Sequence, residues 1–117
     1  MRYMSLIYHD EKSWNALSEK ERQGIYKEYR QLIEELQSRG QFLAGEQLQP
    51  AETAKSVRVR EGKQLVTDGP FAETREQIGG FFMIEAKDMT DALNIAARIP
   101  SARTGAIEVR PVVEPSH

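Results

Sequence analysis

Two short segments, residues 2–8 and 80–86, carry apolar side chains at nearly every position. Side chains alternate between the two faces of a β-strand, so each segment predicts a strand that is apolar on both faces. Such strands belong in the centre of a sheet. They constrain the fold more than any other feature, because both faces of that sheet then have to be covered.

The sequence also predicts two amphipathic helices. Ser18 and Glu21 have the spacing of a capping box, and Gly40 can take the left-handed conformation that ends a helix. Asp88, with Asp91 three residues later, predicts the start of a second helix that Pro100 ends. The apolar residues at helical spacing are Ile25, Tyr29, Leu32, Ile33 and Leu36 in the first helix, and Met89, Ala92, Leu93, Ala96 and Ile99 in the second.

Further strands are predicted at residues 42–44, 56–60, 64–67 and 106–110, with a hairpin turn at Glu61 and Gly62. The order of elements predicts an α+β sandwich in which both helices pack on one side of an antiparallel sheet. Two helices cover only one face. A second copy of the chain or an apolar ligand is therefore expected on the other face, and a homodimer is the first choice.

Composition narrows the possible functions. The chain has 117 residues, which suit a single domain over residues 1–117, and it has no cysteine for disulfides or thiolate metal sites. Its 16 basic and 18 acidic residues give a net charge of −2, which argues against general nucleic-acid binding. The first residues do not resemble a signal peptide and no segment is apolar for long enough to span a membrane, so we expect a cytoplasmic protein.

Residues 68–76 read DGPFAETRE and are followed at 79–82 by GGFF. This pattern resembles the signature of the YCII-related, or DGPF-domain, family. Segments 3–8, 43–48 and 99–103 also resemble family members, so the likeness covers nearly the whole chain. The resemblance implies a ferredoxin-like α+β sandwich with an extra β-hairpin, which pairs sheet to sheet with a second copy to form a dimeric α+β barrel.

The resemblance also implies two alternative functions. Most members are uncharacterised bacterial proteins, some resemble small-molecule lyases such as dehydrochlorinases, and many are encoded beside sigma factors of the extracytoplasmic-function group. One alternative is a cofactor-independent lyase or isomerase that acts on a small molecule. The other is a non-catalytic ligand-binding or protein-interaction module linked to sigma-factor regulation.

The broader family is thought to use a His–Asp pair, which implies His9 and Asp68 as catalytic residues here. His9 follows the first strand and Asp68 begins the turn after the hairpin, while the other histidine, His117, ends the chain. A carboxylate beside an imidazole holds it in one tautomer for proton transfer. The structural alternatives are that His9 precedes a helix cap at Asp10 and that Asp68 organises its own turn.

Substrate-binding candidates are Arg75, Glu73, Glu46 and Arg103, whose segments match the family. Arg75 can hold a carboxylate through two parallel donors, although a surface ion pair is the structural alternative. Gly79 and Gly80 predict a bulge or a close backbone approach at the start of a central strand. One internal histidine supplies no two-histidine metal site and no nucleotide-binding motif occurs, so the sequence predicts no metal and no cofactor.

Overall fold

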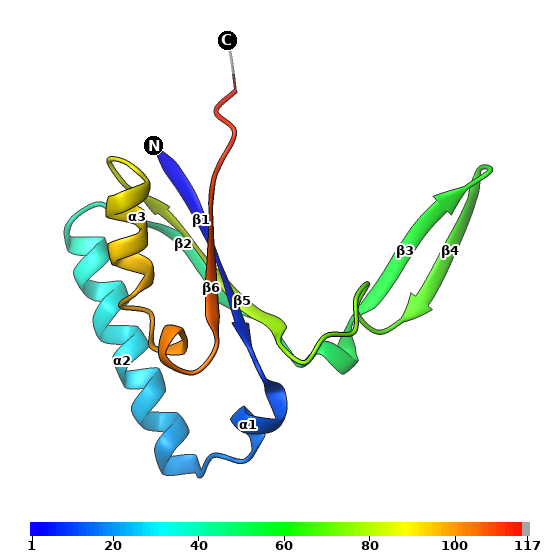
Figure 1. The fold of residues 1–117 in the computed structure, drawn as a ribbon, viewed down its shortest axis with the longest axis horizontal. Coiled ribbons are helices and arrows are strands. Elements are labelled where there is room, and N and C mark those ends of the chain that lie inside the picture. Colours follow the sequence, from blue (N-terminus) through cyan, green and yellow to red (C-terminus); the bar gives the residue numbers. More distant parts are fainter. Residues whose placement is uncertain (116–117) are drawn as a thin grey trace.

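Strands β1 (Arg2–His9) and β5 (Gln77–Glu85) form the centre of a four-stranded antiparallel sheet in the computed structural model, which describes residues 1–115 (Figure 1). The sheet is completed by β2 (Phe42–Gln47) beside β5 and by β6 (Ala106–Pro111) beside β1. This order is consistent with a ferredoxin-like α+β fold. The two predicted central strands are confirmed, although β5 begins three residues earlier than expected.

Helices α2 (Glu19–Ser38) and α3 (Met89–Ala96) lie on the same side of the sheet (Figure 1). The predicted capping box is present: the Ser18 hydroxyl accepts from the Glu21 amide, and the Glu21 carboxylate accepts from the Ser18 amide. Asp88 caps α3 as predicted. No helix within residues 1–115 is both long and apolar enough to cross a membrane.

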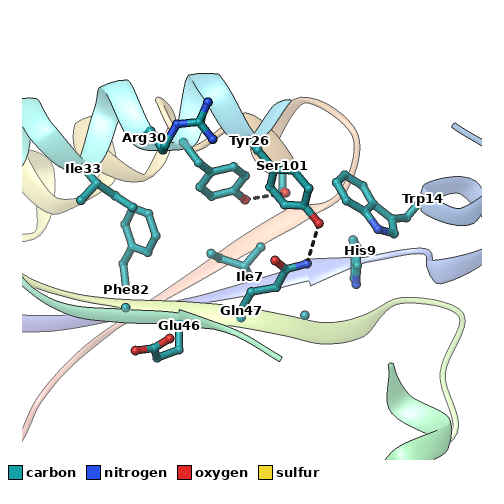
Figure 2. A pocket seen from close by; sticks show the side chains of 14 residues that line it. Ile7, His9, Trp14, Tyr26, Arg30, Ile33, Glu46, Gln47, Phe82 and Ser101 are labelled. Carbon is teal, nitrogen blue, oxygen red and sulfur yellow. Dashed lines mark hydrogen bonds between the residues drawn. The ribbon is translucent and has the colours of Figure 1, made fainter. Parts of the chain in front are cut away.

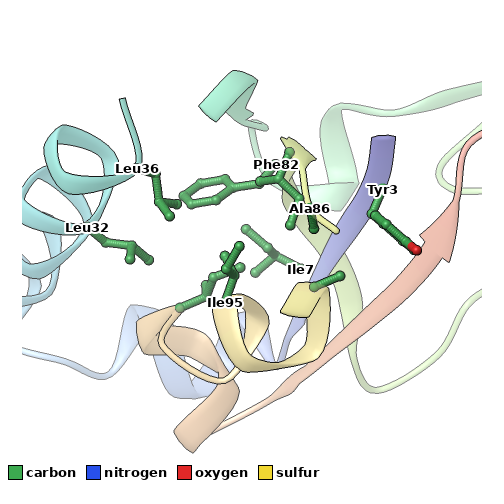
Figure 3. Packing of buried hydrophobic residues seen from close by; sticks show 10 residues of the cluster. Tyr3, Ile7, Leu32, Leu36, Phe82, Ala86 and Ile95 are labelled. Atoms are coloured by element: carbon green, nitrogen blue, oxygen red, sulfur yellow. The ribbon is translucent and has the colours of Figure 1, made fainter. Parts of the chain in front are cut away.

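The buried core lies between these helices and the sheet (Figure 3). Leu36 of α2 and Ile84 of β5 are fully buried, at 0% exposure each. One predicted core residue is wrong: Leu93 is 50% exposed, whereas Ile95 is buried in its place. Helix α3 ends at Ala96 and not at Pro100 as predicted. Its sheet-facing stripe contains Ala92 and Ile95, the buried Ile99 follows beyond its end, and Leu93 falls outside the stripe.

Hydrophobic spacing predicted none of three short helices, although the cap at Asp10, the structural alternative for His9, indicated the start of the first and is confirmed. Helix α1 (Glu11–Asn15) follows β1 and is capped by Asp10, whose carboxylate accepts from the Lys12 amide. The 3₁₀ turns η1 (Ala51–Thr53) and η2 (Pro100–Arg103) precede the hairpin and β6. None contains enough residues to show a helical period, so hydrophobic spacing could not reveal them.

The face of the sheet opposite α2 and α3 is apolar and has no helix over it. Met4 lies opposite Met83, and Leu6 lies opposite Phe81, across the β1–β5 pair. These side chains alternate with the buried residues of their strands and remain partly exposed. The sequence-based expectation of an apolar second face is therefore confirmed.

Strands β3 (Lys55–Arg60) and β4 (Lys63–Asp68) form a separate two-stranded hairpin that projects away from the rest of the chain (Figure 1). Its turn at Glu61 and Gly62 has positive φ at both residues, 51° and 74°, as a tight two-residue hairpin turn requires. Val57 and Val59 are 61% and 62% exposed. An isolated hairpin is only marginally stable in water, and this one buries neither valine.

Ser5 provides a test of the packing. Its side chain is 0% exposed and its Oγ has no hydrogen-bond partner among the described residues. We expect Ser5→Ala to raise the free energy of unfolding by about 1 kcal/mol, because it removes an unsatisfied buried hydroxyl. Chemical denaturation measures the change. Ser101→Ala is the control. The Ser101 Oγ lies 2.7 Å from the Tyr29 hydroxyl, so its loss should lower the free energy of unfolding. Equal destabilisation of the protein by both variants would contradict the packing described.

Candidate functional site

A cavity of about 280 Å³ lies between the helix side of the sheet and α2 (Figure 2). Its aromatic lining consists of Trp14 from α1, Tyr26 and Tyr29 from α2, and Phe82 from β5. The rings are packed edge to face, with centroids 5.6 Å apart for Trp14 and Tyr26 and 6.0 Å apart for Tyr29 and Phe82. Small-molecule sites are typically concave, mostly apolar and provided with a few polar groups, and this cavity lies at the small end of their size range.

His9 enters the cavity beside a β-bulge at Gly79. Ile7 pairs with Gly80 but the next residue, Tyr8, pairs with Ile78, so Gly79 is an extra residue in β5. A Cβ at position 79 would overlap the His9 Nε2, so the observed position of the imidazole depends on glycine there. The predicted bulge is confirmed, and its effect is that the imidazole lies directly against the strand backbone.

His9 is reachable from a second hollow. That hollow has a volume of about 330 Å³ and shares His9, Trp14 and Gln47 with the first cavity. The Trp14 ring lies 6.2 Å from the His9 ring, centroid to centroid, and closes one side of the junction. No hydrogen bond within residues 1–115 engages the imidazole nitrogens.

Two hydrogen bonds place polar groups among the aromatic rings (Figure 2). The Gln47 side-chain amide lies 3.2 Å from the Tyr26 hydroxyl, to which it donates. The Tyr29 hydroxyl lies 2.7 Å from the Ser101 Oγ. Burial raises the pKa of Tyr29 above its ordinary value, with a smaller opposing contribution from the Ser101 hydrogen bond, so this phenol stays neutral at physiological pH.

The predicted site residues lie in different places. His9 lines the cavity, and Glu46 contributes to its wall, but the Glu46 side chain is drawn on the other side of the sheet from the aromatic rings (Figure 2). Glu73 is an exposed residue in the loop after the hairpin and does not line the cavity. His117 lies outside the described residues.

The other charged candidates form ion pairs within the chain. Asp68, 88% exposed at its side chain, bonds to the Lys55 Nζ at 2.6 Å, and no hydrogen bond joins it to His9. Arg75 bonds to the carboxylate of Asp10 at 3.2 Å and thereby lowers the pKa of Asp10. Arg103 bonds to Glu28 at 2.6 Å. The His9–Asp68 pair stays a prediction. Within one chain Arg75 forms the surface ion pair that was its structural alternative, and Arg103 forms an ion pair for which the sequence analysis gave no alternative.

Sequence reasoning did not identify the cavity residues Trp14, Arg30 and Gln47. Tyr26, Arg30 and Ile33 recur at helical spacing, so the sequence places them on one face of α2. The sequence analysis considered only the apolar residues of this helix and therefore overlooked Arg30. Trp14 lies on a helix that hydrophobic spacing did not predict. No cluster of three or more potential metal ligands occurs in the part of the chain that the structure describes.

A ferredoxin-like α+β domain with a projecting hairpin and an aromatic cavity at the end of its central strands is the class that this geometry defines. A family model for the YCII-related domain matches residues 1–116. The chain is 33% identical over 114 residues to "Uncharacterized protein R00369" of Rhizobium meliloti (strain 1021), covering 96% of this chain and 92% of that protein. The chain belongs to the YCII-related domain family.

Gly79 tests the close approach to His9. We expect Gly79→Ala to displace the imidazole, because the new methyl group would overlap its Nε2 and Cδ2 atoms. The His9 ring resonances in an NMR spectrum should shift, while the free energy of unfolding should change by less than about 2 kcal/mol, since a side-chain end can move aside.

Gly24→Ala is the matched control. Gly24 lies in α2 and has open space around it, so an alanine there should leave the His9 resonances in place and stabilise the helix by about 0.5–1 kcal/mol. Unchanged His9 resonances in Gly79→Ala would contradict the contact.

Proposed function

We propose that this YCII-related protein binds a small molecule in the aromatic cavity and catalyses a cofactor-independent lyase or isomerase reaction. The observation that carries the proposal is an imidazole, free of hydrogen bonds within residues 1–115, at the junction of two hollows. Histidine exchanges protons near neutral pH, and an acid/base group within reach of a bound ligand typically accelerates proton transfer 10²- to 10⁴-fold. Rings around the ligand exclude water from the reacting atoms.

In this proposal His9 removes a proton from a carbon atom of the ligand. In an isomerisation the electron pair left on carbon shifts within the ligand and the imidazolium returns the proton to another ligand atom. In an elimination that pair forms a carbon–carbon double bond, the leaving group departs with its bonding electrons, and the imidazolium passes its proton to the leaving group or to water. Asp68 has to approach His9 to keep its predicted role as its partner, because within one chain its carboxylate bonds Lys55 and no hydrogen bond joins it to His9.

We further propose that the protein is a dimeric α+β barrel in which the open sheet faces of two copies pack together. The support is the apolar surface that Met4, Leu6, Phe81 and Met83 form on the open face of the sheet. No helix within residues 1–115 lies over this surface. Removing such a surface from water favours association, and a twofold pair buries the same face on both copies.

A protein-interaction module, linked to sigma-factor regulation as the resemblance suggests, is the second candidate function. It is favoured by the β3–β4 hairpin, where Val57, Val59 and Val66 on one face are more than half exposed. Phe71, in the loop after the hairpin, is 76% exposed, and the Arg58 guanidinium lies 4.7 Å from its ring centroid. This surface is separate from the cavity, so binding of a protein there is compatible with a ligand in the cavity.

Proton transfer can be tested by deuterium exchange in D₂O, observed by NMR. Small ligands with an acidic C–H bond, such as 4-(2-oxopropyl)benzoate and phenylacetone, which is the same molecule without the carboxylate, serve as probes. We expect the protein to accelerate exchange at the acidic carbon over buffer, and His9→Gln to reduce that acceleration by at least about 100-fold.

Asp68→Asn is the companion variant in this assay. A decrease similar to that of His9→Gln supports the pair, whereas unchanged exchange removes Asp68 from the mechanism. Equal exchange by the protein and by His9→Gln, or exchange no faster than in buffer across the probes, would contradict the proposed chemistry.

The dimer can be tested by light scattering on purified protein. A single chain has a mass of 13.3 kDa, so we expect about twice that mass for the protein and the single-chain mass for Phe81→Asp, which places a charge in the middle of the open face. Leu93→Asp is the control, because Leu93 is an exposed apolar residue on α3. Circular dichroism verifies folding, and a wild-type protein of single-chain mass would overturn the dimer.

A further inference from the structure

Arg30 is exceptional among the arginines of this chain. Seven others form ion pairs with carboxylates: Arg2, Arg22, Arg39, Arg75, Arg98, Arg103 and Arg110. On the hairpin, Arg58 lies over the Phe71 ring, and Arg60 donates to the Val59 carbonyl. Outside the hairpin, Arg30 is the one arginine without a carboxylate partner within residues 1–115.

Arg30 also lines the aromatic cavity, at its exposed rim on α2. Glu34 follows it by one helical turn but does not bond to it, which agrees with the weaker pairing of a basic residue placed before an acidic one at this spacing. The Glu46 carboxylate lies on the other side of the sheet (Figure 2). The residues that line the cavity therefore include an arginine at its rim and a histidine, and neither bonds to a carboxylate within residues 1–115.

We propose that the cavity recognises a small aromatic carboxylate, with Arg30 binding the carboxylate and the ring packing among Trp14, Tyr26 and Phe82. A guanidinium presents two parallel donors that match a carboxylate, and aromatic side chains favour stacked or edge-to-face contact with a flat ligand. The cavity volume of about 280 Å³ suits a ligand of one or two rings. This inference rests on the proposed function and specifies its ligand.

The two polar groups divide the ligand into a binding end and a reacting end. Figure 2 draws Arg30 on α2 toward the Ile33 side of the cavity, whereas His9 lies on the Trp14 side. A carboxylate held by Arg30 directs the opposite end of the molecule toward the imidazole. The proton that His9 moves therefore belongs to a carbon remote from the carboxylate, across the ring or on a ring substituent.

The inference can be tested by the binding of 2-naphthoate and its neutral analogue 2-naphthamide, measured by isothermal titration calorimetry. Both probes have the same flat ring system, and only the first has a negative charge. We expect the protein to bind 2-naphthoate at least about tenfold more tightly, because a charge-assisted bidentate contact is stronger than a neutral one. Trp14 is the single tryptophan, so a shift of its indole N–H resonance on binding places the probe in the cavity.

Arg30→Gln and Arg103→Gln are the matched variants. Arg30→Gln should remove the preference for the carboxylate while leaving the binding of 2-naphthamide unchanged, and Arg103→Gln should retain the preference because that arginine is already paired with Glu28 and does not line the cavity. Equal affinity for both probes, no shift of the Trp14 resonance at millimolar probe, or a preference that survives Arg30→Gln each overturns the inference.

The assay measures affinity and not turnover, so it separates this inference from the proposed chemistry. A carboxylate preference that depends on Arg30, in a protein that does not accelerate deuterium exchange, supports the ligand class and removes the catalytic role of His9. Exchange that depends on His9 but is equally fast with ligands lacking a carboxylate supports the chemistry and overturns the role of Arg30.

Discussion

The close contact between the His9 imidazole and the backbone at Gly79 is the constraint on which the site depends. An extra residue in β5 shifts the β1–β5 register by one position. The last two residue pairs before α1, at Tyr8 and His9, are therefore out of step with the pairs that precede them. Bulges bend a strand and redirect neighbouring side chains. Here the absence of a side chain at Gly79 lets the imidazole lie against the strand, where the cavity and the adjoining hollow meet.

The same two strands create both surfaces that the proposed function needs. One face carries Phe82 and Ile84 into the core beneath α2 and α3, and toward its end the packing loosens into the aromatic cavity. The other face carries Leu6 and Phe81 toward a second copy in the proposed dimer. Strands β1 and β5 both contribute to each surface. A ligand or a charge change in the cavity is therefore expected to alter the association of two copies through the open face.

The sequence predicted the fold well where a periodic pattern and a specific cap coincide. The capping box at Ser18 and the hydrophobic stripe of α2 determine that helix locally, and apolar residues on both faces identify β1 and β5. The site was predicted less well, because the distances between its members depend on tertiary packing. Trp14 and Gln47 are far apart in sequence and meet only when α1 and β2 lie beside the same end of the sheet, and the pairing of Asp68 with Lys55 depends on the hairpin register.

The account depends most directly on where the His9 ring lies, and a nuclear Overhauser experiment on the protein in solution measures this. We predict cross-peaks from the His9 ring protons to the Gly79 α-protons and to the Trp14 indole protons, because the imidazole lies against the first and beside the second. Cross-peaks to neither residue, with His9 ring resonances at the positions of a solvated histidine, would show that the imidazole lies outside the cavity and would contradict the account.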